Sequence, residues 1–285
     1  MQRLVRAGAR TFAGVAPDEV AERVAGLPVQ AQRLTFDVCD AEAVQAAVAR
    51  AAPQIVFHLA AIGVTDPGVD PGLALAVNAG GTLHLLEALR GQGVQRVVLV
   101  GTSYEYGARE AVERLDPFSA YAASKVAAWA FGRMYWRAYG LPVVTVRPFQ
   151  VYGPGQPAHT LITAAIRAAL MGEDFPMTPG EQERDFIYVN DVVEGMLAAA
   201  TSPGIEGQSL DLGTGQANAV RHIVERVWEL VRGAGHILPG ALSYRPGEVM
   251  YLIADADRTA ALIGWRAQVG LEEGLHRSIE WIKGR

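Results

Sequence analysis

This 285-residue chain has few of the residues that mark disulfide-rich, metal-binding or membrane proteins. Its single cysteine, Cys39, excludes an internal disulfide and a zinc site built on several cysteines. Such low cysteine use is typical of a reducing compartment, so we expect a cytoplasmic protein. The histidines do not stand at metal-ligand spacing with carboxylates, so no metal site is predicted. The sequence has no run of 18 or more apolar residues, so no membrane span is predicted.

The charge balance argues against nucleic acid as a partner. The chain has 25 Lys+Arg and 30 Asp+Glu, a net charge of −5, whereas a nucleic-acid binder would carry basic stripes. Lysine itself is scarce, because Lys125 and Lys283 are the only lysines. Lys283 lies near the C-terminus and is interpreted as a solvated charge, so Lys125 becomes the candidate for a specific role. Half of the residues are hydrophobic, which is enough for a sizeable core.

Strand and helix patterns alternate through the first half of the chain. Short apolar runs rich in β-branched residues predict buried strands, and the segments between them carry apolar residues at helical spacing. The predicted strands are residues 34–38, 55–59, 97–100 and 143–146, and the predicted helices are residues 41–52, 71–90 and 119–139. This alternation predicts an α/β fold with a doubly wound parallel sheet.

The pattern changes after Gly153, where prolines become frequent and helices no longer lead regularly into strands. We therefore divide the chain into residues 1–153 and a smaller lobe over residues 154–285, with helices over 220–231 and 271–282 and some chain returning to the sheet. Ligands of open α/β sheets bind beyond the carboxyl ends of the strands. The chemistry should therefore follow Val100 and Val146.

A tyrosine and a lysine four residues apart open the helix that follows the third predicted strand. Tyr121 and Lys125 share one helix face, and a nearby ammonium favours the phenolate, which would lower the pKa of the tyrosine. Thr102 or Ser103, at the end of the preceding strand, could direct a hydroxyl at the same substrate oxygen. Interconversion of a carbinol and a carbonyl needs such a general acid and base while hydride moves at the carbon.

The chain resembles the extended short-chain dehydrogenase/reductases, the NAD-dependent epimerase/dehydratase group that works on nucleotide sugars. The resemblance runs from about residue 31 to the end and implies a Rossmann-like sheet. Its blocks are Asp-Val-Cys-Asp at 37–40, Val-Phe-His-Leu-Ala-Ala at 56–61, Val-Asn-Ala-Gly-Gly-Thr at 77–82, Tyr121-x-x-x-Lys125, Arg-Pro-Phe-Gln-Val-Tyr-Gly-Pro at 147–154, Arg-Asp-Phe-Ile-Tyr-Val-Asn-Asp at 184–191, Asp-Leu-Gly-Thr-Gly at 211–215 and Arg-Pro-Gly-Glu at 245–248.

The resemblance implies a role for each matching residue. Tyr121 is the acid/base, Thr102 the catalytic hydroxyl, and Lys125 binds the nicotinamide ribose. Residues 1–153 form the dinucleotide-binding domain, with an incomplete N-terminus, and residues 154–285 mainly bind substrate. The remaining residues expected at the cofactor, NADP or NAD, are Arg6, Asp37, Val38, Leu59, Ala60, Ala61, Asn78 and Phe149. Those expected at a nucleotide-diphosphate sugar are Ser103, Tyr104, Gln150, Arg184 and Arg245, the two arginines on its diphosphate. The helix that begins with Tyr121 would join a homodimer interface.

The start of the chain departs from the family. A dinucleotide fold opens with a strand and a Gly-x-x-Gly-x-x-Gly loop that enters a helix, whose N-terminus holds the pyrophosphate. One alignment makes residues 4–6 the second strand, followed by a short helix near residues 18–25, with the first strand and glycine loop absent. The other makes residues 8–14 a degraded fingerprint. We favour the first, because the 23 positions from Gly14 to Asp37 are too few for the elements that must follow.

The favoured alignment has two consequences. It predicts a truncated product or a protein that has lost cofactor binding, since the central strand would be missing. It also places Arg6 after the second strand, where an arginine favours the 2′-phosphate of NADP.

The reaction stays open between two kinds. Ser103 and Tyr104 stand where the family's dehydratases carry acidic residues, which disfavours elimination of water. This leaves epimerisation at a ring carbon or reduction of a 4-keto sugar, and the Gly101-Thr102-x-x-Glu105-Tyr106-Gly107 form resembles 4-ketoreductases. The rival interpretation is a non-catalytic sugar-nucleotide-binding protein on the same scaffold. A general alcohol or steroid dehydrogenase is disfavoured by the long C-terminal lobe.

Overall fold

The computed structural model describes residues 1–18, 24–66, 68–107, 115–245 and 247–284. The helices are α1 (Gln2–Arg6), α3 (Ala41–Ala51), α4 (Pro71–Ala74), the π-helical η1 (Leu75–Gly80), α5 (Gly81–Leu89), the 3₁₀ turn η2 (Ser103–Tyr106), α6 (Ala120–Tyr139), α7 (Leu161–Met171), α8 (Val189–Thr201), α9 (Val220–Val231), α10 (Ala256–Ile263) and α11 (Leu271–Lys283). The strands are β1 (Phe12–Val15), β2 (Gln32–Thr35), β3 (Ile55–His58), β4 (Arg96–Val100), β5 (Val143–Pro148), β6 (Gln150–Tyr152), β7 (Phe175–Met177), β8 (Glu183–Arg184), β9 (Phe186–Tyr188), β10 (Ser209–Leu212), β11 (Asn218–Ala219), β12 (Ile237–Pro239) and β13 (Tyr251–Leu252).

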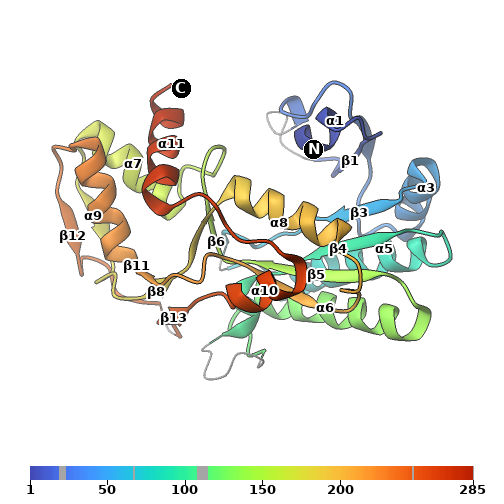
Figure 1. The fold of residues 1–285 in the computed structure, drawn as a ribbon. Coiled ribbons are helices and arrows are strands. Elements are labelled where there is room, and N and C mark those ends of the chain that lie inside the picture. Colours follow the sequence, from blue (N-terminus) through green and yellow to red (C-terminus); the bar gives the residue numbers. More distant parts are fainter. Residues whose placement is uncertain (19–23, 67, 108–114, 246, 285) are drawn as a thin grey trace.

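A four-stranded parallel sheet in the order β10-β5-β4-β3 forms the centre of the molecule. Helices α5 and α6 lie along one face of this sheet and α8 lies along the other (Figure 1). Alternate residues of β4 face opposite layers: Val97 and Leu99 join the cluster with α5 and α6, and Val98 joins the cluster with α8. The predicted doubly wound α/β fold is confirmed.

Most elements of this central part lie where the periodicity predicts them. The strands predicted at 55–59, 97–100 and 143–146 match β3, β4 and β5 to within two residues. The helix predicted at 71–90 is one continuous helical run, but its middle widens into the π-helical η1. The strand predicted at 34–38 begins two residues earlier, at Gln32, and ends at Thr35.

The favoured alignment misplaces the second strand, and the other alignment misplaces the glycine fingerprint. Residues 4–6, predicted as a strand, belong to helix α1, and the first strand is β1, which pairs in parallel with β2. Gly14 lies inside β1 and not in a loop between a strand and a helix, so residues 8–14 are not a strand-to-helix fingerprint. The helix predicted near residues 18–25 lies largely outside the described residues.

Among the five sheets that the described strands form, the parallel sheets β2-β1 and β3-β4-β5-β10 contain the strands of the nucleotide-binding pattern. In the strand order 3-2-1-4-5-6 of dinucleotide-binding folds, β2 and β1 correspond to strands 3 and 2, and β3, β4 and β5 correspond to strands 4, 5 and 6. Strand β10 extends the sheet beyond β5. Among the described residues, no strand fills the position between β1 and β3.

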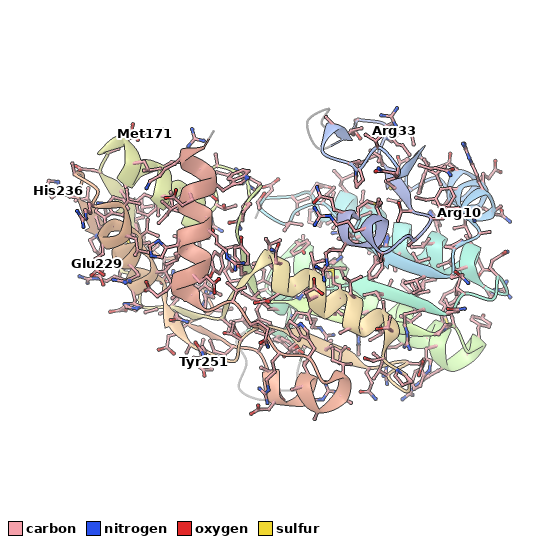
Figure 2. All side chains as sticks on the ribbon, turned by 45° about the horizontal axis from the view of Figure 1, so that its top comes forward. Arg10, Arg33, Met171, Glu229, His236 and Tyr251 are labelled. Carbon is pink, nitrogen blue, oxygen red and sulfur yellow. The ribbon has the colours of Figure 1, made fainter. Side chains whose placement is uncertain are left out.

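A helical lobe packs at the other end of the molecule. Helices α7, α9 and α11 share a buried cluster that includes Ile166, Ile223 and Leu275. Figure 2 shows the labelled Met171 and His236 on this lobe, at the opposite end from Arg10 and Arg33. Strand β10 returns from beyond residue 153 to pair with β5, so the sheet is completed by the second half of the chain.

One helical run, Pro71–Leu89, is long and apolar enough by length and composition to cross a membrane. It packs against α3 and α6, and its buried Asn78 and Thr82 form hydrogen bonds inside the protein. These contacts are those of a core helix in a globular protein.

Two leucines on this run provide a test of the packing. Leu86 is fully buried between α3, α6 and the sheet, whereas Leu73 is 53% exposed. We expect Leu86→Ala to lower the free energy of unfolding by about 2–5 kcal/mol, because it removes buried methyl groups and leaves a cavity. Leu73→Ala is the matched control, with an expected change of less than about 1 kcal/mol. Chemical denaturation monitored by far-ultraviolet circular dichroism measures both, and equal losses would contradict this packing.

Candidate active site

Thr102 and Tyr121 meet at the carboxyl end of β4. Thr102 caps η2, where its side-chain oxygen accepts the N–H of Tyr104 at 3.3 Å. Tyr121 lies in the first turn of α6, which Ser119 caps by accepting the N–H of Ala122 at 3.1 Å. The Thr102 hydroxyl lies near enough to the Tyr121 phenol to lower its pKa, against the effect of burial. The two residues that the sequence predicts at one substrate oxygen are therefore adjacent.

Burial dominates the proton affinity of Tyr121. It raises the pKa of the phenol to about 12, the Thr102 hydroxyl acts in the opposite direction, and the charges of Glu105 and Tyr104 add to the increase. The expected lowering of this pKa by Lys125 is therefore wrong. Burial removes the phenolate from water, and this destabilises the charged form more than the neighbouring groups stabilise it.

Lys125 is buried on the same face of α6, with 4% of its surface exposed. Burial lowers its pKa to about 8, and the charge of Glu105 opposes that change. Lys125 and Tyr121 are thus two buried ionisable side chains one helical turn apart, both with shifted pKa values. Such a pair indicates a candidate functional site.

The residues expected at the cofactor follow the ends of β2 and β3. Leu59 and Ala60 are exposed and Ala61 is half-buried, directly after β3. Asn78 does not reach outward but orders this loop: its amide accepts the N–H of Ile62 at 2.9 Å and donates to the Ile62 carbonyl at 3.1 Å and to Ser124 at 2.9 Å.

Three further residues that we expect at the cofactor, Asp37, Val38 and Phe149, are held by local contacts. Asp37 accepts the N–H of Cys39 at 2.8 Å in the loop after β2. A Cβ atom on Gly81 would lie 2.8 Å from a methyl carbon of Val38, so only glycine lets the helical run approach this loop so closely. Phe149 is buried against the ring of Tyr106, with centroids 6.4 Å apart.

These residues fit the nicotinamide end of a dinucleotide better than its pyrophosphate. Lys125, Tyr121 and the ordered loop after β3 suit a ribose and a nicotinamide ring. The sequence contains no intact Gly-x-x-Gly-x-x-Gly to hold the pyrophosphate. Arg6 lies exposed on α1 rather than after a strand, so its predicted preference for NADP loses its basis.

Three of the residues that we expect at the substrate, Gln150, Arg184 and Arg245, lie around the phenol of Tyr104. The Tyr104 hydroxyl donates to Gln150 at 3.4 Å, and the charges of Arg184, Glu248 and Arg245 all act on that phenol, whose pKa burial raises. Arg184 is buried and forms an ion pair with Glu248 at 2.6 Å, whereas Arg245 is exposed. Ser103, by contrast, is buried within η2.

Sequence reasoning assigned no role to several buried acids. Asp185 accepts the N–H groups of Thr214 and Gly215, both at 2.8 Å, and that of Ala254 at 3.2 Å. Burial raises the pKa of this carboxyl, although each of these bonds acts against the increase. Asp191 similarly accepts the N–H groups of residues 268 and 269. The only sequence signal was an acid inside an apolar run, which indicates a satisfied buried group without naming its partners.

His58 is a buried core histidine. Its Nε2 lies 3.0 Å from the hydroxyl of Thr82, and burial together with the Lys125 charge lowers its pKa to about 3. Among the described residues, no group of three His, Cys, Asp or Glu side chains is arranged to hold a metal ion.

Comparison with known proteins agrees with this geometry. The sequence pattern of the NAD dependent epimerase/dehydratase family matches residues 1–213. The chain belongs to this family. The predicted resemblance is thereby confirmed, and the family is one of enzymes.

Individual relatives in this family are nucleotide-sugar enzymes. The chain is 31% identical over 264 residues to a UDP-glucose 4-epimerase of Mycolicibacterium smegmatis, covering 87% of this chain and 82% of the relative. The UDP-glucose 4-epimerase structure of Thermotoga maritima, solved with UDP-glucose, has a TM-score of 0.89 at 26% identity and covers 99% of this chain and 94% of its own. That of Thermus thermophilus, a complex with NAD, has a TM-score of 0.84 at 29% identity, with the same coverage.

The low pKa of His58 makes the stability of this epimerase/dehydratase family member depend on pH. In the unfolded chain His58 binds a proton below about pH 6.5, whereas in the folded protein it stays neutral down to about pH 3. The free energy of unfolding therefore falls as the pH falls between these values. This one group should lower the free energy of unfolding by about 1.5 kcal/mol between pH 6.5 and pH 5. Urea denaturation at both pH values should show a smaller loss for His58→Gln than for the wild type. The control, His159→Gln at an exposed position, should keep the wild-type loss.

Proposed function

We propose that this protein catalyses reversible oxidation at a ring carbon of a nucleotide sugar, as a UDP-hexose 4-epimerase. The observation that carries the proposal is that Thr102, Tyr121 and Lys125 lie buried together, Thr102 at the end of β4 and the other two on α6. The identity to a UDP-glucose 4-epimerase supports the choice of substrate class. Residues 1–153 are proposed to hold the cofactor and residues 154–285 mainly the substrate.

In this mechanism the chain's own residues manage the proton at the sugar oxygen. A phenol with a pKa of about 12 is protonated near neutral pH, so Tyr121 is ready to donate its proton to a ring ketone. In the reverse step the same oxygen takes the proton of the sugar hydroxyl. Thr102 donates a second hydrogen bond to the same substrate oxygen and fixes its position. When bound, the nicotinamide supplies and accepts the hydride.

The substrate side supplies charge for a diphosphate. Arg184 and Arg245 are proposed to bind its oxygens, since a guanidinium fork matches phosphate geometry. The Arg184 guanidinium is held by Glu248, so binding would exchange a carboxylate partner for a phosphate partner. Tyr104 and Gln150, which are hydrogen-bonded to each other, are proposed to contact the sugar hydroxyls.

NAD is the proposed cofactor, because the Thermus thermophilus epimerase structure is a complex with NAD and the sequence argument for NADP fails at Arg6. A cytoplasmic homodimer is also part of the proposal. The single cysteine supports a reducing compartment. Exposed apolar side chains on η1 and α6, namely Leu75 and Met134, support the packing of a second copy against these elements.

A 4-ketoreductase is the second candidate, favoured by the Thr102-x-x-Glu105-Tyr106-Gly107 segment. The two reactions differ in how they use the cofactor. An epimerase returns the hydride, so we expect the 4-epimer of UDP-glucose to accumulate over many turnovers with catalytic NAD and no net NADH. Chromatography of the sugar nucleotides and absorbance at 340 nm measure both quantities.

Each other outcome of this assay has a definite meaning. Stoichiometric consumption of NADH or NADPH with a 4-keto-6-deoxy sugar nucleotide would replace epimerase by ketoreductase. A folded protein that binds UDP-sugar but neither NAD nor NADP in calorimetric titration would support the non-catalytic alternative, for which the missing glycine fingerprint is the argument.

The acid/base role of Tyr121 has its own test. Tyr121→Phe removes the proton-carrying oxygen without changing the ring, and we expect kcat to fall at least about 100-fold. Affinity for UDP-glucose should change less than about threefold, because the diphosphate arginines are untouched. Tyr139→Phe, on the exposed end of the same helix, is the control and should keep full activity. A Tyr121→Phe enzyme with most of its rate would end the assignment.

A further inference from the structure

A buried carboxylate is hydrogen-bonded to the backbone of the proposed catalytic residue Thr102. Glu105, in the 3₁₀ turn after β4, has no exposed surface. Its Oε1 accepts the backbone N–H of Thr102 at 2.9 Å, and its Oε2 accepts Nε of Arg147 at 2.7 Å. A Cβ atom on Gly101 would lie 2.3 Å from Oε1, so this carboxylate occupies room that only a glycine leaves.

Arg147 holds this carboxylate from the neighbouring strand, β5. Its guanidinium is 3% exposed and lies over the rings of Tyr106 and Trp129, at 5.0 and 5.6 Å from their centroids. Nη1 donates to the Tyr106 hydroxyl at 3.3 Å, and that hydroxyl donates to Asp211 at 2.6 Å. A continuous network of hydrogen bonds therefore runs from η2 after β4, through Arg147 of β5, to Asp211 of β10. A network with so many partners fixes the carboxylate in one orientation.

The groups around Lys125 come from three elements. His58 faces it from β3 and is neutral at ordinary pH, since its pKa is about 3. Tyr121 lies one turn earlier on α6 and is protonated. Among the described residues, Glu105 is the charged group that raises the pKa of Lys125, against the burial that lowers it to about 8. Its negative charge also favours the protonated phenol of Tyr121, whose pKa Tyr104 raises further.

We propose that Glu105 is a positioning residue of this site, whose carboxylate, held by Arg147, fixes the backbone at Thr102 and keeps Lys125 protonated. Glu105 does not touch the substrate and acts through the two residues that do. A purely structural ion pair would need only Arg147 as its partner. Here one carboxylate oxygen of Glu105 accepts the Thr102 N–H. The negative charge of Glu105 acts on both Tyr121 and Lys125. The catalytic meaning of this arrangement rests on the proposed function.

The effect of Glu105 on the protonation of Lys125 can be measured directly, because the protein has only two lysines. Labelling the lysine Cε atoms with ¹³C gives signals from Lys125 and Lys283 alone, and the exposed Lys283 serves as an internal reference. We expect Glu105→Gln to move the titration of Lys125 to lower pH by about 0.5–1 unit, since a nearby negative charge is lost. Lys283 should not move. A Lys125→Met protein assigns the two signals.

The matched control breaks another Arg–Glu pair on the same sheet. Glu206 pairs with the buried Arg96 at 2.8 Å, and Glu206→Gln should leave the titration of Lys125 at its wild-type position. If both glutamine variants move Lys125 equally, the change reflects general loosening of the sheet and the proposal fails.

Arg147 left without its carboxylate could prevent folding, since breaking a buried pair is strongly destabilising. The double variant Glu105→Gln/Arg147→Met removes both charges and should fold, and its Lys125 titration should show the same acid shift. An unshifted Lys125 in a folded variant of either kind overturns the proposal, whether or not the enzyme turns over.

The kinetic consequence is read separately. In Glu105→Gln we expect kcat at pH 7 to fall about tenfold or more, with KM for UDP-glucose changed less than about threefold. The basic limb of the pH profile of kcat should move in the same direction as the Lys125 titration. A shifted Lys125 with unchanged kcat would overturn the positioning role and leave the proposed function intact. Inactivity of the wild type would count against the proposed function and not against the lysine result.

Discussion

The site depends on the parallel pairing of β3, β4 and β5, which brings the carboxyl ends of three strands to one edge of the sheet. Because β4 ends at Val100, the next residues turn at once into η2, and that turn delivers Thr102 and Glu105. Strand β5 carries Arg147 one strand away, so the ion pair crosses from one strand end to the next. Each polar group at this edge therefore has its position set by backbone hydrogen bonds made elsewhere in the sheet.

Burial at this edge has opposite effects on the two ionisable residues of α6. It raises the pKa of Tyr121 and lowers that of Lys125, so both side chains are driven toward their neutral forms. Glu105 supplies the negative charge that retains the proton on Lys125. Tyr121, the proposed acid/base, is thus held protonated and buried, which suits the proton transfer to a carbonyl oxygen proposed for it.

The amino-acid pattern predicts the central elements well and the N-terminal ones poorly. Helix α9 begins and ends at the predicted residues, and β3 to β5 lie within two residues of theirs, because strong apolar periodicity and tertiary burial agree there. Residues 4–6 are predicted as a strand but form part of α1. A run of three residues fits either period, so only its surroundings could decide, and here the salt bridge of Arg3 with Glu194 ties the segment to α8.

Spacing and scarcity in the sequence determined the core of the candidate site. The four-residue interval joins Tyr121 to Lys125 on one helix face, and the near absence of lysine elsewhere in the chain marks Lys125 as a residue with a specific role. Only the tertiary structure showed that Glu105 turns inward to Thr102 and Arg147, that Asn78 orders the loop after β3, and that Arg184 is held by Glu248. These partners are 16 to 64 residues apart in the chain, apart from Glu105 and Thr102. A local pattern can assign a residue to a strand end or a helix face, but which distant side chain satisfies it is decided by packing.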